Sequence, residues 1–210
     1  MFLRELVIHN YRSWFEENRE TFERTLKKPM DALANDTVKA LLEKFPDEPL
    51  STHVSRIYRD ARRLFGRGPF KETMWFSIKP FESRQDGVSF YFEIKPFGWE
   101  AGFGYWGETP STMASLRHYI DAHEKEFIRF QEQMDRQTYF QTGGELYARP
   151  KGHTDDALYR IYNSKSLWFH HQEPYGETLF SSELPNLLAE RFAECMPFYR
   201  ELVKASVTCE

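Results

Sequence analysis

The spacing of hydrophobic residues changes along the chain from a helical period to a strand period and back. In the first 45 residues hydrophobic side chains recur every three or four positions, which predicts helices. Ser13 and Glu16 form a capping-box pair that predicts one helix start, and Pro29 interrupts that helix or begins the next. Beyond Pro29 the apolar side of an amphipathic helix consists of Met30, Leu33, Ala34, Thr37, Val38, Leu41, Leu42 and Phe45.

The period falls to two in the middle of the chain. Residues 74–79, 88–95 and 99–105 alternate between large apolar side chains and polar side chains or glycine, which predicts three half-buried strands. An earlier strand is expected at about residues 53–58. Because the connections between these runs are short, we expect neighbouring strands to be antiparallel.

Helical spacing returns after Thr109, which is a suitable N-cap because Pro110 follows it. The pattern predicts helices around 113–120 and 127–134, a short helix at 155–162, a strand at 167–171 and a C-terminal helix after Ser182 that Pro197 bends or restarts. Strands in the middle with helices before and after indicate an α+β fold. We expect a central, mainly antiparallel sheet packed by N- and C-terminal helices, in a single domain over residues 1–210.

Composition narrows the class of protein. Of the 210 residues 17% are aromatic, which is enough to bury a substantial core, while a mean hydropathy of −0.66 argues against a membrane protein. The charges of Arg4 and Glu5 fall where a signal peptide needs apolar residues. Cys195 and Cys209 are too few for a disulfide framework or a zinc cage. These features predict a cytoplasmic protein.

Charge is concentrated in one segment. Residues 51–80 contain seven basic and two acidic side chains, a net charge of +5 in a chain whose total is −4, so the remaining residues carry −9. The basic side chains are Arg56, Arg59, Arg62, Arg63, Arg67, Lys71 and Lys79. Guanidinium groups bind carboxylates or phosphates through paired planar donors, and several together need a neutralising partner or contact with water.

The same segment carries a family resemblance. The run Arg56-Ile57-Tyr58-Arg59-Asp60-Ala61-Arg62 and the later Gly68-Pro69-Phe70-Lys71 resemble the signature of the domain of unknown function 2461 family. Further matches are Asn10-Tyr11-Arg12-Ser13-Trp14-Phe15 with Asn18-Arg19, Gly102-Phe103-Gly104-Tyr105-Trp106, Arg149-Pro150-Lys151-Gly152 and Ser164-Lys165-Ser166. The chain departs from the pattern at 65–68, where the family has a Ser-x-Asp-Lys-like stretch, and at Phe70, where it has tyrosine. The resemblance implies one compact α+β domain over about residues 2–203 and no established activity.

We therefore expect a pocket for a small anionic or phosphorylated molecule. Arg56, Arg59, Arg62 and Lys71 would supply charge, Tyr58 and Asp60 would orient them, and Lys151 and Lys165 from the later basic motifs would border the site. If a reaction follows binding, Asp60 and His153 are the nearest candidates for proton transfer. In the competing hypothesis the protein is a non-catalytic structural or interaction protein, whose arginines form internal ion pairs, with Asp60, Glu93 or Glu100 as candidate partners, or dock an acidic partner.

Three other chemistries have weaker support. Basic residues interleaved with Tyr58, Phe65, Phe70 and Trp75 suit a single-stranded nucleic-acid binder, but a pI near 6.0 argues against a long basic track. The spacing of the seven histidines is poor for a metal, so we expect neither metal nor cofactor. Gly102 and Gly104 lack a phosphate-loop context and favour close packing. The sequence leaves ligand, reaction and oligomeric state open.

Overall fold

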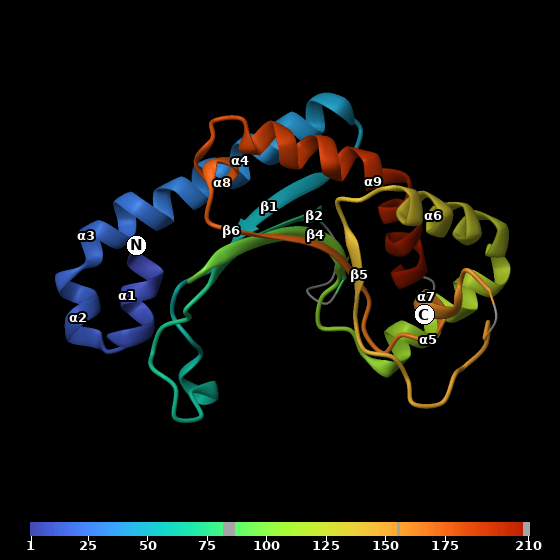
Figure 1. Ribbon diagram of the computed structural model, residues 1–210, viewed down its shortest axis with the longest axis horizontal. Coiled ribbons are helices and arrows are strands. Elements are labelled where there is room, and N and C mark those ends of the chain that lie inside the picture. The colour runs from blue at the N-terminus through green and yellow to red at the C-terminus, as the bar shows by residue number, and fades with distance from the viewer. Residues whose placement is uncertain (82–86, 155, 208–210) are drawn as a thin grey trace. The chain divides into compact units, whose positions relative to one another are not determined.

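A computed structural model describes residues 1–81, 87–154 and 156–207 (Figure 1). Its six strands form one antiparallel sheet in the order β1-β2-β3-β4-β6-β5, which confirms the α+β class. The strands are β1 (Leu50–Val54), β2 (Met74–Pro80), β3 (Val88–Lys95), β4 (Gly98–Tyr105), β5 (Gln141–Gly143) and β6 (Trp168–Pro174). Cys209, and Asp155 at the start of the predicted helix 155–162, lie outside the described residues.

Helices account for most of the remaining regular structure. They are α1 (Phe2–Ile8), α2 (Arg12–Glu17), α3 (Arg19–Phe22), the π-helix η1 (Glu23–Lys27), α4 (Lys28–Lys44), the 3-10 turn η2 (Ala61–Arg63), α5 (Pro110–Ala122), α6 (Glu124–Arg136), α7 (Tyr159–Tyr162), α8 (Glu177–Phe180) and α9 (Leu184–Val207). None of the helices within the described ranges is long and apolar enough to span a bilayer.

The chain divides into two compact units. The first comprises Met1–Phe81, Tyr91–Ala101 and Gln172–Glu190, and the second comprises Glu82–Phe90, Gly102–His171 and Arg191–Glu210. The expectation of a single domain over residues 1–210 stays a prediction.

In the first unit α4 lies across one face of β1 and β2 (Figure 1). Strand β1 pairs with β2 from Leu50 opposite Pro80 to Val54 opposite Phe76. The strand expected at 53–58 therefore lies earlier, because the chain leaves the sheet at Ser55, whose hydroxyl accepts a hydrogen bond from the Trp75 N–H at 3.1 Å. The large buried side chains of this unit are Phe15, Phe22, Phe70, Phe76, Phe92 and Trp99.

Stacked aromatic rings fill the core of the second unit. Phe90 lies 4.2 Å from Tyr199 and 4.7 Å from Phe192, measured between ring centroids, and Phe103 lies 4.8 Å from Phe169. A Cβ atom at Gly104 would lie 2.5 Å from the Cα of Trp168, so the glycine permits the close approach of the neighbouring strand.

Helix boundaries test the expected caps. Thr109 caps α5 in a reciprocal pair with Thr112, as its sequence predicts. The Ser13 cap is wrong, because α2 begins two residues earlier than that cap predicts and Tyr11 occupies the N-cap position. Pro29 lies in the first turn of α4 and so begins the next helix, which is one of the two expected alternatives, and α9 continues through Pro197 without a restart.

The π-helix η1 has a cause in the sequence. Pro29 has no N–H group to donate to the carbonyl of residue 25, so an α-helical bond is missing there. The turn before it is wider, and the Lys28 N–H donates to the Glu23 carbonyl five residues back. The helix therefore continues from α3 into α4 through a local change of spacing.

Candidate functional site

The basic segment leaves the sheet between β1 and β2 and folds back on itself within the first unit (Figure 1). Tyr58 and Phe70 form an isolated antiparallel bridge. On either side of it the Arg59 N–H donates to the Pro69 carbonyl at 2.9 Å, and the Lys71 N–H donates to the Ile57 carbonyl at 2.7 Å. This pairing brings Arg56 and Arg59 close enough to Lys71 for their charges to act on it.

Asn10 fastens this segment to the N-terminal helices. Its Oδ1 accepts from the Phe70 N–H at 3.0 Å, while its Nδ2 donates to the Phe70 carbonyl at 3.0 Å and to Glu72 Oε1 at 2.9 Å. A Cβ atom at position 68 would lie 2.2 Å from the Asn10 Cγ, so only glycine fits there. Two motifs of the family resemblance are thus bound to each other.

Tyr58 has a structural role in this arrangement. Its ring packs 5.3 Å from Phe70 and 5.9 Å from Phe15, and Phe70 stacks on Phe15 at 4.1 Å. Its hydroxyl accepts a long hydrogen bond of 3.4 Å from Arg19 Nη2. These contacts hold the segment against α2.

Arg59 is largely neutralised by the protein itself. Its side chain is 12% exposed, and its Nη2 lies 2.5 Å from Glu72 Oε2. Because Glu72 also accepts from Asn10, the ion pair is part of the structural anchor. The Nε atom of Arg59 is buried and has no acceptor among the described residues.

Asp60 and Arg62 satisfy each other at the surface. Arg62 Nη2 lies 2.7 Å from Asp60 Oδ2, and its Nε donates to Oδ1 at 3.0 Å. Asp60 Oδ1 also accepts the Arg62 N–H at 3.0 Å, which caps η2. Asp60 therefore neutralises Arg62 within the chain, as the competing hypothesis expects, but because the Arg62 side chain is 88% exposed the pair contributes little to stability.

Lys71 is different, because it is half-buried among positive charges. Burial lowers the pKa of its ammonium group, the charges of Arg56 and Arg59 lower it further, and Glu93 acts in the opposite direction. The Nζ atom lies 5.8 Å from the centroid of the Trp75 ring. We call Lys71, Arg56 and Arg59 the cation centre.

The carboxylates proposed as arginine partners are bound by another lysine. Lys95 Nζ lies 2.6 Å from Glu100 Oε2 and 3.7 Å from Glu93 Oε2. The Tyr91 hydroxyl donates to Glu100 Oε1 at 2.5 Å, and burial together with this carboxylate raises the pKa of Tyr91. The described partner of the cation centre is therefore Glu72.

Lys151 and Lys165 belong to the second unit. Lys151 Nζ lies 4.7 Å from the centroid of the Tyr147 ring, and Lys165 Nζ lies 3.7 Å from Glu145 Oε2. Their contribution to an anion site with Arg56 or Lys71 stays a prediction.

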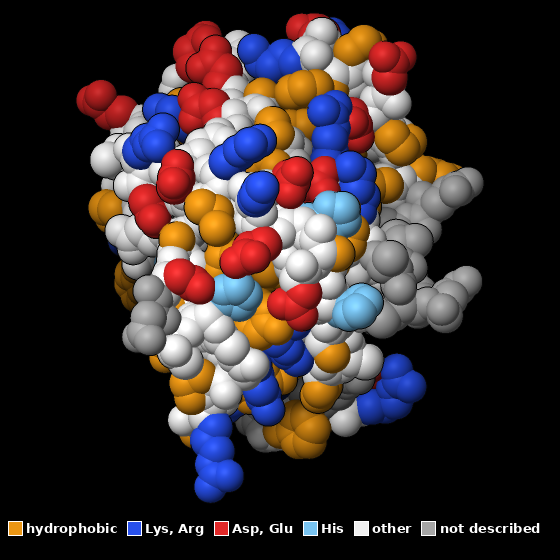
Figure 2. Space-filling view, turned by 90° about the vertical axis from the view of Figure 1, so that its right-hand side faces the viewer, with side chains coloured by type: hydrophobic (Ala, Val, Ile, Leu, Met, Phe, Trp, Pro, Cys, Tyr) orange, Lys and Arg blue, Asp and Glu red, His pale blue; other side chains and the backbone are white. Residues whose placement is uncertain are grey.

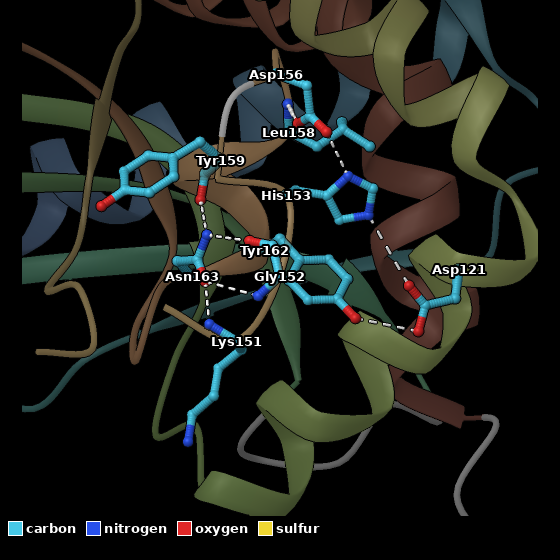
Figure 3. Close-up of polar contacts among 9 residues, drawn as sticks. All are labelled: Asp121, Lys151, Gly152, His153, Asp156, Leu158, Tyr159, Tyr162 and Asn163. Atoms are coloured by element: carbon cyan, nitrogen blue, oxygen red, sulfur yellow. Dashed lines mark hydrogen bonds and ion pairs between the residues drawn. The ribbon is translucent and has the colours of Figure 1, made fainter. Parts of the chain in front are cut away.

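A second polar cluster surrounds His153 (Figure 3). His153 Nδ1 lies 2.7 Å from Asp156 Oδ2, and its Nε2 lies 4.0 Å from Asp121 Oδ1. The Tyr162 hydroxyl donates to Asp121 Oδ2 at 3.1 Å, and its pKa is raised by burial and by this carboxylate. His153 has a φ angle of 47°, a strained backbone conformation that is enriched at functional sites. Its flanking carboxylates could support proton transfer.

Asn163 holds the loop that carries His153. Its Oδ1 accepts from the Lys151 N–H at 2.5 Å, and its Nδ2 donates to the Gly152 and Tyr159 carbonyls at 2.7 and 2.8 Å (Figure 3). The side chain is fully buried. The sequence gives no sign of this role, because an asparagine at the end of a short helix carries no local signal for contacts eleven residues away.

The described residues can be compared with the two remaining chemistries, a metal site and a long basic track. No group of three histidine, cysteine or acidic side chains suited to a metal occurs within the described ranges. On the face drawn in Figure 2, basic, acidic and histidine side chains are interspersed across most of the surface. That face therefore offers no continuous basic path for a nucleic-acid backbone.

Comparison with known proteins identifies a family. The family model described as "Conserved hypothetical protein (DUF2461)" matches residues 1–200. That description names no activity. No curated protein matches the chain.

Proposed function

We propose that this chain, which belongs to the DUF2461 family of conserved hypothetical proteins, binds a small anion at the cation centre. The observation that carries this proposal concerns Arg56 and Lys71, which form no ion pair within the part of the chain that the structure describes. An unpaired, half-buried ammonium group is costly unless an opposite charge neutralises it. A bound anion would supply that charge.

The side chains indicate the class of anion. Arg56 offers a planar pair of donors, Lys71 offers a compact point charge, and both bind phosphate or carboxylate oxygens. Trp75 beside Lys71 offers a ring face for an apolar or planar part of the molecule. A small phosphorylated or carboxylated metabolite fits this chemistry, and phosphate is the simplest probe.

The proposed site contains fewer residues than the site expected from the sequence. Tyr58, Asp60 and Arg62 are engaged in packing, in the η2 cap and in a surface ion pair. Their contacts favour the structural hypothesis for those three residues. In the cation centre Arg59 is paired with Glu72, whereas the half-buried Lys71 and the exposed Arg56 form no ion pair with a described residue.

Binding is tested with inorganic phosphate and pyrophosphate by calorimetry and thermal shift, against sodium chloride at equal ionic strength. We expect saturable binding that weakens at least tenfold in Lys71→Met and in Arg56→Gln. Arg67→Gln is the matched control, because it removes an exposed charge from the same segment and leaves the cation centre intact. Equal affinity in Lys71→Met and the native protein refutes the proposal.

The pH dependence gives an independent test. A lysine whose pKa is lowered by folding binds fewer protons in the folded state than in the unfolded one, so its contribution to the free energy of unfolding rises with pH. The rise falls between the lowered pKa and the ordinary value of 10.5. In phosphate-free buffer at pH 7 we expect Lys71→Met to be more stable than the native protein in urea denaturation. Saturating phosphate should reduce or reverse that difference, and a phosphate-independent difference contradicts the assignment.

A further inference from the structure

The first unit contains a cavity of about 830 Å³, which we call the N-terminal cavity. Such a volume is within the range of small-molecule sites. Its walls come from α1, from the continuous helix of α3, η1 and α4, and from the chain before and at the start of α9. Most of the lining is apolar and includes Leu26, Met30, Leu33, Phe92, Leu179 and Phe180.

The wider turn of η1 forms part of this wall. Thr25 and Leu26 lie on η1 and line the cavity. The Thr25 hydroxyl donates to the Thr21 carbonyl at 2.8 Å, so the helix itself satisfies this polar group. A π-helical turn is a rare departure from α-helical spacing that recurs at functional sites.

Helix α8, which few contacts hold in place, borders another side of the N-terminal cavity. Helix α8 has no buried residue, and Phe180 is 72% exposed although it borders the cavity with Leu179. Exposed aromatic surface beside an apolar hollow is surface that a ligand can cover. Small displacements of α8 would also admit a ligand, since few contacts hold it.

Charges at the cavity select among apolar ligands. Among the described residues the lining contains the exposed carboxylates of Glu5 and Asp36 and no lysine, arginine or histidine. The charge of the lining side chains is therefore negative. This balance disfavours a fatty acid and favours a positively charged head group.

We propose that the N-terminal cavity binds an amphiphilic amine, a molecule with an apolar body and one protonated nitrogen. The apolar body lies against Leu26, Met30 and Phe92, and the ammonium group lies near Asp36 or Glu5. This ligand has the opposite charge to the one proposed for the cation centre, so the two sites are independent. Lys71→Met should leave amine binding unchanged.

The test compares three twelve-carbon ligands of different charge, dodecylammonium, dodecanol and dodecanoate, by calorimetry below their micelle-forming concentrations. We expect one saturable site, with dodecylammonium bound most tightly and dodecanoate at least tenfold more weakly. Asp36→Asn should weaken dodecylammonium severalfold and leave dodecanol unchanged. Glu43→Gln is the control, because it removes an exposed carboxylate of α4 that does not line the cavity.

A second pair of variants locates the site. Leu33→Trp fills the cavity and should reduce binding of dodecylammonium at least tenfold, with the circular dichroism spectrum retained. If Leu33→Trp fails to fold, Ser182→Trp at the exposed rim serves the same purpose. Unchanged affinity in a folded tryptophan variant overturns the location. Dodecanoate that binds as tightly as dodecylammonium, or binding that does not saturate, overturns the proposed ligand class.

Discussion

Replacement of Asn163 by alanine should destabilise the loop at 149–153 more than any exposed polar substitution. Asn163 is fully buried and makes three short hydrogen bonds to backbone groups, two of them to Lys151 and Gly152. The variant leaves those backbone groups without their partner. The loop then loses the contacts that hold His153 in its strained conformation.

The expected loss follows from the number of bonds. A hydrogen bond contributes about 1 kcal/mol net, and a buried group left unsatisfied costs up to about 3 kcal/mol. Because the Lys151 and Gly152 groups can become hydrated when the loop opens, we expect a total loss of about 3 kcal/mol. For a chain of this length that corresponds to a fall in melting temperature of about 6–12 °C.

Two measurements check this prediction. Urea denaturation followed by circular dichroism gives the free energy of unfolding, and limited trypsin digestion reports on the Lys151–Gly152 peptide bond, which should be cut faster in Asn163→Ala. Asn186→Ala is the matched control, because Asn186 is exposed and its one side-chain hydrogen bond, to Glu183, is 3.4 Å long. A loss below about 1 kcal/mol with unchanged digestion would refute the reasoning.

Two further predictions concern the other anchored regions. Gly68→Ala should lower the free energy of unfolding in urea by about 2–4 kcal/mol, because the added methyl group displaces the Asn10 side chain from its hydrogen bonds. A free energy of unfolding within about 0.5 kcal/mol of the native value contradicts this account. Burial and the neighbouring Glu194 raise the pKa of the Cys195 thiol to about 12. In a Cys209→Ser background Cys195 should therefore react with a thiol reagent at pH 8 only after unfolding. Labelling of the folded protein within minutes would rule out this environment.

The sheet was predictable where one face of a strand is buried and the other is not. The alternation in β3 has that origin, whereas β4 is buried on both faces over 101–105 and alternates between larger side chains and glycine; the Thr109-Pro110 cap is equally local. Strand β5 gives no signal in the hydrophobic pattern, because its three residues are fixed by pairing with β6 and carry no period of their own. Pro29 explains the wider turn of η1 only when the helix is known to continue past the proline.

The positive charge of the candidate site was predictable from the sequence, but the partners of its side chains were not. A net charge of +5 in residues 51–80 indicated that the basic side chains need partners. The sequence could not show that Asn10 binds Phe70 sixty residues away, or that Glu72 belongs to Arg59. Contacts over such distances leave no spacing pattern, so only the folded chain reveals them.

The path of the backbone has a practical consequence for dissecting this protein. The chain passes between its two units after residues 81, 90, 101, 171 and 190. No continuous stretch of the gene therefore encodes either unit, and a truncation at any of these points removes material from one unit or both. Expressing one unit alone would require joining three separate segments of the chain. Point substitutions are therefore the appropriate way to assign roles to the residues of each unit.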